Sequence, residues 1–67
     1  MPTLRVNGET LSLAGPATVA DLLREQGLTG RKVAVELNGE IVPKSRHAET
    51  VLADGDRIEI VVAVGGG

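Results

Sequence analysis

The chain has 67 residues, enough for one domain, and 42% of them are hydrophobic although none is aromatic. It contains no cysteine, which excludes disulfides, thiolate metal sites and a cysteine nucleophile, so aliphatic packing must stabilise the fold. Nine acidic and seven basic side chains give a formal net charge of -2. A negative net charge argues against a nucleic-acid partner, and so does the absence of aromatic side chains on which bases could stack.

The N-terminus shows no targeting segment. Residues 1–5 alternate in polarity instead of forming an apolar signal segment, and no apolar run approaches membrane-spanning length. We therefore expect no membrane partner and a cytoplasmic location.

The first segments predict a β-hairpin. Residues 3–7 and 9–13 both alternate between apolar and polar side chains. Between them lies Asn7-Gly8, a pair that accepts the positive φ angles of a tight turn. The two segments are therefore expected to pair antiparallel.

A helix is predicted next. Thr18 is a favourable N-cap, and Asp21 three residues later comes close to a capping box. Gly27 is placed to end the helix in a left-handed cap after about nine residues. The apolar residues on one helical stripe are Val19, Leu22 and Leu23.

Residues 33–42 predict a second hairpin. The segment 33–37 alternates with its odd-numbered residues facing inward, and Asn38-Gly39 provides another tight turn. The short segment 40–42 then meets Pro43, which has no backbone N–H for a ladder. This strand is therefore expected at an edge of the sheet.

The remaining segments are a connection and the longest strand. Residues 44–52 have no clean periodicity, and we expect a short helical turn and a loop with Val51 and Leu52 folded inward. Residues 54–56 form a turn, and residues 57–64 alternate as the final strand.

This order of elements predicts an α+β fold of two layers, a mixed sheet of about five strands with one main helix packed on one face. The connections let the first and last strands lie side by side, parallel, in the centre, which is the β-grasp (ubiquitin-like) arrangement. A central position also protects the apolar stretch 60–64, which would be an aggregation hazard at an edge. We expect a β-grasp domain over residues 1–64 and a flexible glycine tail over 65–67.

The phase of the last strand predicts an apolar surface near the C-terminus. If the even-numbered residues 58–64 face the helix, Val61 and Ala63 lie on the open face of the sheet. Isolated exposed valines are common, so an ordinary surface and a partner-docking patch both remain open.

Three glycines end the chain, Gly65, Gly66 and Gly67. Glycine makes up about 7% of average usage, so chance is a poor account of the run, although a cloning linker is an alternative. Extended, three residues reach at most about 10 Å, and without Cβ atoms another protein can grip them closely. A carboxylate needs activation before it reacts. Residues 27–32, GLTGRK, lack P-loop spacing, so activation must come from a partner.

Several stretches resemble a known family. LNGEIVP at 37–43, DGDRIEIV at 54–61 and the ending VGGG are similar to the ThiS family of ubiquitin-like sulfur carriers, which serve thiamin thiazole synthesis. The resemblance implies that a ThiF-type adenylyltransferase uses ATP and Mg to adenylate the carboxylate of Gly67. Cysteine-derived sulfur then gives a thiocarboxylate, which a ThiG-type thiazole synthase consumes. The family ending is commonly Gly-Gly, and the third glycine here lengthens the arm.

The site follows from this reading. Gly67 would be the reactive residue, and the chain would be a co-substrate of its partners instead of an enzyme, binding no cofactor or metal itself. The residues expected to bind partners are Gly65, Gly66, Val61, Ala63 and Val64.

Two alternatives stay open. The terminal glycines are shared with the small MoaD-like subunit of molybdopterin synthase, so they indicate the mechanism better than the pathway. In a reading of another class, the chain is a non-covalent β-grasp interaction module with a slack tail.

Other polar residues point to no further chemistry. His47 lies in an irregular polar segment, and we expect a solvated surface position because one His without further ligands makes no metal site. Glu36 and Glu59 alternate with apolar strand residues and are expected to be solvated. Lys44 and Arg46 could form a basic contact.

Overall fold

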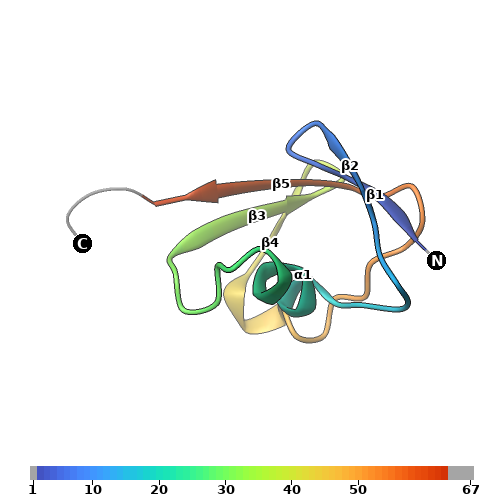
Figure 1. Ribbon diagram of the computed structural model, residues 1–67. Helices are drawn as coiled ribbons and strands as arrows, with labels where there is room; N and C mark the ends of the chain where they lie inside the picture. Colours follow the sequence, from blue (N-terminus) through green and yellow to red (C-terminus); the bar gives the residue numbers. More distant parts are fainter. Residues whose placement is uncertain (1, 64–67) are drawn as a thin grey trace.

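Residues 2–63, described in the computed structural model, form a five-stranded sheet with one α-helix against one face (Figure 1). Met1 and residues 64–67, and with them Val64, the predicted glycine tail and the boundary between domain and tail, lie outside the described residues. The elements are β1 (Thr3–Val6), β2 (Glu9–Ser12), α1 (Val19–Glu25), β3 (Val33–Leu37), β4 (Glu40–Val42), the 3₁₀ helix η1 (Lys44–Arg46) and β5 (Arg57–Val62).

The strand order places β5 in the middle of the sheet. The order is β2-β1-β5-β3-β4, with β5 parallel to β1 and antiparallel to β3. The hairpins β1–β2 and β3–β4 are antiparallel, and Figure 1 shows α1 and η1 on the same side of the sheet. The predicted two-layer α+β arrangement is confirmed, including the central parallel pair and the edge position of β4 before Pro43.

Both Asn-Gly turns form as predicted, and their asparagines also reach β5. Asn7 and Asn38 have φ angles of 50° and 52°. The side chain of Asn7 pairs with both backbone groups of Ile60: Oδ1 accepts the N–H at 2.7 Å and Nδ2 donates to the carbonyl at 3.2 Å. Asn38 Oδ1 accepts the N–H of Arg57 at 2.9 Å. The two turns therefore hold β5 from both sides.

The helix ends follow the predicted signals. Thr18 and Asp21 form a reciprocal capping box, in which the Thr18 hydroxyl accepts from the Asp21 N–H and the carboxylate accepts from the Thr18 N–H. At the other end, Gly27 adopts a φ of 73° and the N–H of Leu28 donates to the Leu23 carbonyl at 2.8 Å. This pattern is a Schellman cap, which limits α1 to seven residues instead of the nine expected.

The core is aliphatic and lies between α1 and the sheet. It combines residues of α1, the three inner strands and two connecting segments. None of the helices in the described residues is long and apolar enough to span a membrane. The buried side chains are Leu4, Val6, Leu13, Val19, Leu22, Leu23, Val35, Leu52, Ile58 and Ile60.

The inward position predicted for Val51 is wrong, whereas that of Leu52 is confirmed. Val51 is 65% exposed and Leu52 is 3% exposed. Val51 forms an isolated antiparallel bridge with Thr18, and Leu52 donates its N–H to the carbonyl of Ala17. Because the backbone is extended at this bridge, the two successive side chains point to opposite sides, and only one can enter the core.

The predicted surface position of His47 is also wrong. The residue is 7% exposed, and its Nε2 lies 3.0 Å from the carbonyl oxygen of Val42. Its own carbonyl accepts the N–H of Ala20 in α1. The turn after η1 therefore folds the imidazole under the sheet, where it satisfies a backbone carbonyl at the end of β4.

Candidate functional site

The end of β5 is held in a fixed position by β3. Val61 pairs with Ala34 and Val62 with Val33 in the antiparallel register. Beyond the strand, Ala63 donates its N–H to the carbonyl of Lys32 at 2.8 Å. The chain thus leaves the sheet from a defined point, beside the start of β3.

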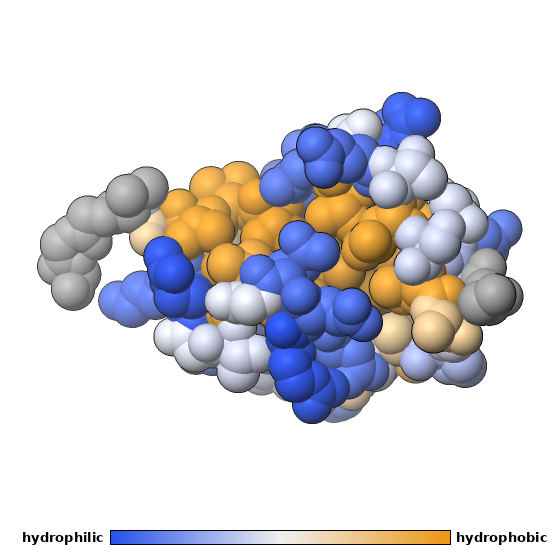
Figure 2. All heavy atoms as spheres, in the orientation of Figure 1, coloured by the Kyte–Doolittle hydropathy of each residue, from blue (hydrophilic) through white to orange (hydrophobic). Residues whose placement is uncertain are grey.

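An exposed apolar surface borders this point, on the face of the sheet away from α1. Val61 is 65% exposed, and Ala63 and Ala34 are also exposed. Ile41 of β4 is 63% exposed and pairs with Glu36, so it shares this face. We call Ala34, Ile41, Val61 and Ala63 the open-face patch. Figure 2 shows apolar surface at the end of the molecule where β5 ends and also across its middle.

Charged side chains occupy the rest of the open face in an ordered way. Along β5 the outward residues change from basic Arg57 through acidic Glu59 to apolar Val61. Glu59 pairs with Glu36 of β3, so two carboxylates lie opposite each other next to the open-face patch. Like charges in directly opposed positions disfavour the sheet, so this arrangement does not serve the stability of the free domain.

The sequence predicted only part of this surface. The outward positions of Val61 and Ala63 are confirmed, whereas Gly65, Gly66, Gly67 and Val64 lie outside the described residues. Ile41 is a further member that the sequence analysis does not predict. Its outward position follows from the register, in which its neighbour Val42 pairs with inward-facing Val35.

The acidic side chains of the described residues have roles other than metal binding. Among residues 2–63 no group of three or more His, Cys, Asp or Glu side chains is placed to hold a metal ion. Asp56 accepts the N–H of Ala53 within the turn, and Asp54 accepts the N–H of Thr3 and so attaches the turn to β1. Within residues 2–63 the candidate site is therefore the open-face patch, beside the point where β5 leaves the sheet.

The comparison with known proteins decides the family. The model of the ThiS family matches residues 4–67. This chain belongs to the ThiS family. The sulfur carrier protein ThiS of Bacillus subtilis is 43% identical over 65 residues, which cover 96% of this chain and 98% of that protein.

A second relative of the ThiS-family chain is much longer. A thiazole synthase of Paramagnetospirillum magneticum is 52% identical over 64 residues, which cover 96% of this chain and 20% of that protein. The chain thus spans about a fifth of the length of this relative.

The ThiS assignment also agrees with the fold. The crystal structure of a thiamine biosynthesis protein (ThiS) from Geobacter metallireducens is 34% identical, with a TM-score of 0.81. The match covers 97% of this chain and 99% of that structure. The β-grasp class and the sulfur-carrier family predicted from the sequence are both confirmed.

Proposed function

We propose that this chain carries sulfur for the thiazole ring of thiamin on the carboxylate of Gly67. A ThiF-type adenylyltransferase uses ATP and Mg to form an acyl-adenylate at this carboxylate and releases pyrophosphate. Sulfur drawn from cysteine, delivered at the oxidation level of sulfide, then attacks the acyl carbon and displaces AMP. The product is a thiocarboxylate, which a ThiG-type thiazole synthase consumes in the cytoplasm. The observation that carries this proposal is the family match, which runs through residue 67.

The chemistry suits the residues present. A carboxylate becomes a good electrophile only when its oxygen is part of a leaving group such as AMP. Glycine has no Cβ to hinder attack on the activated carbon, and the chain has no cysteine that could intercept it from within. In this role the chain is a co-substrate, and ATP and Mg are bound by the activating enzyme.

The open-face patch has a place in this proposal. Immobilising each glycine of the arm in an enzyme pocket costs roughly 1–2 kcal/mol of conformational free energy. Contacts elsewhere must offset this cost, and Val61 and Ala63 lie next to the point where the arm begins. We propose that the partners dock on the open-face patch while gripping Val64, Gly65 and Gly66.

The longer relative supports the thiazole branch over the molybdopterin branch. A region like this chain occurs within a protein named thiazole synthase, which favours a thiazole synthase as the enzyme that takes the sulfur. Incubating the thiocarboxylated chain with thiazole synthase and, separately, with the large subunit of molybdopterin synthase tests this choice. Consumption by the molybdopterin synthase subunit alone would contradict it.

The decisive experiment removes the carboxylate and changes nothing else. A synthetic chain ending in the carboxamide of Gly67 is compared with the unmodified chain for mass gain on exchange of oxygen for sulfur, and for thiazole formation with the reconstituted enzymes. We expect both readouts to be lost for the amide, with an unchanged circular dichroism spectrum.

A chain shortened by one glycine is the matched control for this experiment. It ends in Gly-Gly, still has a terminal glycine carboxylate, and is expected to accept sulfur. If the amide supported thiazole formation at the rate of the unmodified chain, the carrier function would be wrong and the non-covalent interaction module would be correct.

A further inference from the structure

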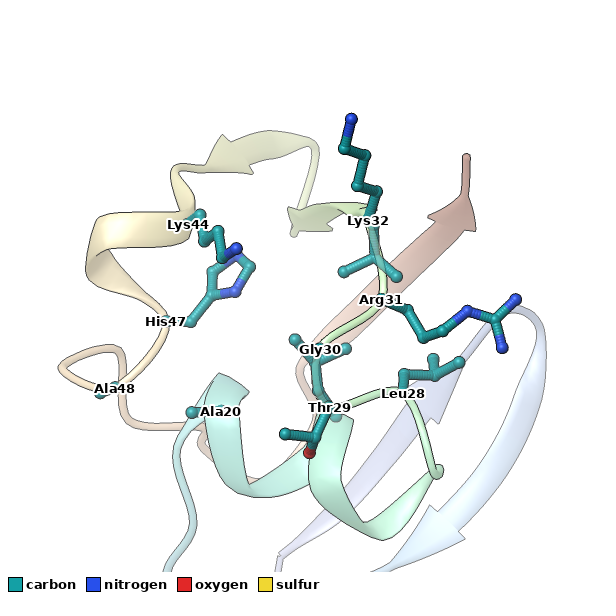
Figure 3. A pocket seen from close by; sticks show the side chains of 11 residues that line it. Ala20, Leu28, Thr29, Gly30, Arg31, Lys32, Lys44, His47 and Ala48 are labelled. Carbon is teal, nitrogen blue, oxygen red and sulfur yellow. The ribbon is translucent and has the colours of Figure 1, made fainter. Parts of the chain in front are cut away.

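A hollow of about 460 Å³ lies on the side of the sheet that carries α1. It is bounded by α1, the loop of residues 28–32 and the turn after η1 (Figure 3). Its volume falls in the range of about 300–1,000 Å³ that is usual for binding pockets. Leu23, Leu28 and Val33 provide apolar wall, so the hollow can bury an apolar side chain.

The charge around the hollow is opposite to that of the whole chain. Arg31, Lys32 and Lys44 line it, and none of its lining residues within the described part is acidic. The ion pair found among residues 2–63 joins Arg24 to Asp21, so no described carboxylate neutralises these three cations. Figure 3 shows Lys44 on one side of the hollow and Lys32 extending from its rim, whereas the guanidinium of Arg31 points away.

His47 adds a fixed polar group to the wall. More than nine-tenths of the residue is buried, and Nε2 is engaged by the carbonyl of Val42. No hydrogen bond within residues 2–63 involves Nδ1 of His47. At the same time, none of the side-chain nitrogen and oxygen atoms in these residues is completely buried without a hydrogen-bond partner. Nδ1 is therefore not sealed within the described residues, and His47 lines the hollow. With Nε2–H bound to the carbonyl, Nδ1 can accept an N–H from a ligand.

The hollow adjoins the root of the C-terminal arm. The backbone carbonyl of Lys32, a residue on its rim, accepts the N–H of Ala63 where the chain leaves the sheet. The open-face patch lies on the opposite side of the sheet. A partner that holds residues beyond Ala63 is therefore within reach of both surfaces.

We propose that the hollow binds an acidic loop of the enzyme that activates the arm. A carboxylate of the loop pairs with Lys44 and Lys32, an adjacent apolar side chain packs on Leu23 and Leu28, and a backbone N–H of the loop donates to His47 Nδ1. The choice of partner rests on the proposed function, whereas the chemistry of the loop follows from the sign of the charge and the apolar wall. Such charge pairing accelerates association and fixes the orientation of the docked carrier.

The test compares two single charge reversals in the full chain. Lys44→Glu places a negative charge at the hollow. Arg5→Glu makes the same change in net charge on the open face, where Arg5 pairs with Arg57 at the start of β5, far from the arm. Binding to the adenylyltransferase is measured by calorimetry at low and high salt. We expect Lys44→Glu to raise the Kd about tenfold at low salt and less at high salt, and Arg5→Glu to leave it within about twofold.

A second variant tests the shape of the hollow without changing charge. Ala48 is exposed and lines the hollow, so Ala48→Leu fills it from the rim while the core stays intact. It should also raise the Kd, and for both variants KM for the carrier should rise while kcat stays unchanged. In spectra of the labelled domain, the amides of Gly30 and Ala48 should shift when the enzyme is added.

The controls separate this inference from the carrier function. All binding experiments are repeated with the C-terminal amide of the chain, which cannot be adenylated. The effect of Lys44→Glu on Kd should be the same in this amide, because binding at the hollow does not depend on thiocarboxylate formation. Equal effects of Lys44→Glu and Arg5→Glu would overturn the proposed site, because only net charge would then matter. Absence of measurable binding, or amide shifts confined to the open-face patch, would overturn it too.

Discussion

Asn7 has two roles, one through its backbone and one through its side chain. Its left-handed backbone conformation closes the first hairpin, and its amide pairs with both backbone groups of Ile60. Within β1 the parallel register with β5 extends only to Val6 and Ile58. The asparagine therefore continues the β1–β5 contact one step beyond the end of β1.

We expect Asn7→Gly to lower the free energy of unfolding by about 1–3 kcal/mol, because the partly buried N–H of Ile60 loses its acceptor while the turn keeps its conformation. Urea denaturation measures the change. Asn38→Gly is the comparison. The side-chain hydrogen bonds of Asn38 to Asp56 and Arg57 are exposed, so their loss should lower the free energy of unfolding by less. Equal losses at both positions would show that only the turns matter.

His47 marks the limit of prediction at the level of single residues. Its neighbours in sequence are polar, so local composition indicates a surface position. Its burial is decided by two groups that η1 and the packing of α1 bring to it, the carbonyl of Val42 and the N–H of Ala20. A sequence pattern contains no signal for such contacts, because they depend on how separate elements pack.

At the scale of elements, α1 is the best-predicted part of the chain because its caps are local. Thr18 and Asp21 are three residues apart and form the capping box that this spacing predicts. Hydrogen bonds from the Thr18 backbone and hydroxyl, with the charge of Arg24, hold the pKa of Asp21 below its ordinary value against an opposing desolvation. The helix start is therefore linked to the ionisation of one carboxylate.

This linkage predicts an acid-sensitive helix cap. Because the folded pKa of Asp21 is lowered, its stabilising contribution is complete above about pH 3.9, the value in an unfolded chain, and is lost as the pH falls through the lower folded value. Asp21→Asn should therefore be less stable than the parent near neutral pH, with a difference that shrinks in acid. Thermal unfolding at a series of pH values measures this difference.

Glu25→Gln, a substitution on the same helix outside the capping box, is the control for this pH series. A gap between the parent and Asp21→Asn that stayed constant down to the most acidic samples would contradict the linkage.

The strands were predictable wherever the alternation was long enough to define a phase. The inward and outward sides of β3 and β5 agree with the alternation of the sequence. The predicted inward position of Val51 is wrong because this residue forms only a single bridge to Thr18. One bridge gives no alternation from which the buried side could be predicted. Ile41 was overlooked because β4 has three residues, too few to show its phase without its partner β3.

At the scale of the whole molecule, the aliphatic core leaves little reserve. Proteins are stable by roughly 0.05–0.15 kcal/mol per residue, so a chain of 67 residues has a total of only about 3–10 kcal/mol. Leu22 and Ile58 are among the most completely buried side chains, one from α1 and one from β5. Each core contact therefore represents a large share of the total.

Leu22→Ala should consequently remove a large share of the stability and lower the Tm strongly, since such a truncation costs about 2–5 kcal/mol. Ile58→Val removes one methylene and should cost only about 0.5–1.5 kcal/mol, which leaves a folded domain with a lower Tm. Thermal denaturation followed by circular dichroism distinguishes the two. A cooperative transition of Leu22→Ala at the Tm of the parent would contradict this account of the core.

A matched pair of substitutions separates the docking face from the core. Val61→Thr keeps the branched shape on the exposed face, so it should weaken binding to the adenylyltransferase while leaving the Tm nearly unchanged. Val35→Thr places the same hydroxyl in the core and should lower the Tm strongly. Unaltered affinity for Val61→Thr would argue against the open-face patch as a contact surface.

The central position of β5 has a mechanical consequence. A force applied to the arm acts along a strand that is bonded on one side to β1 and on the other to β3, with Asn38 attached at its start and Asn7 near its middle. Such a load shears many hydrogen bonds at once, whereas a strand at an edge would peel away bond by bond. An enzyme can therefore draw the arm tightly into a narrow active site while the body of the carrier stays folded against its surface.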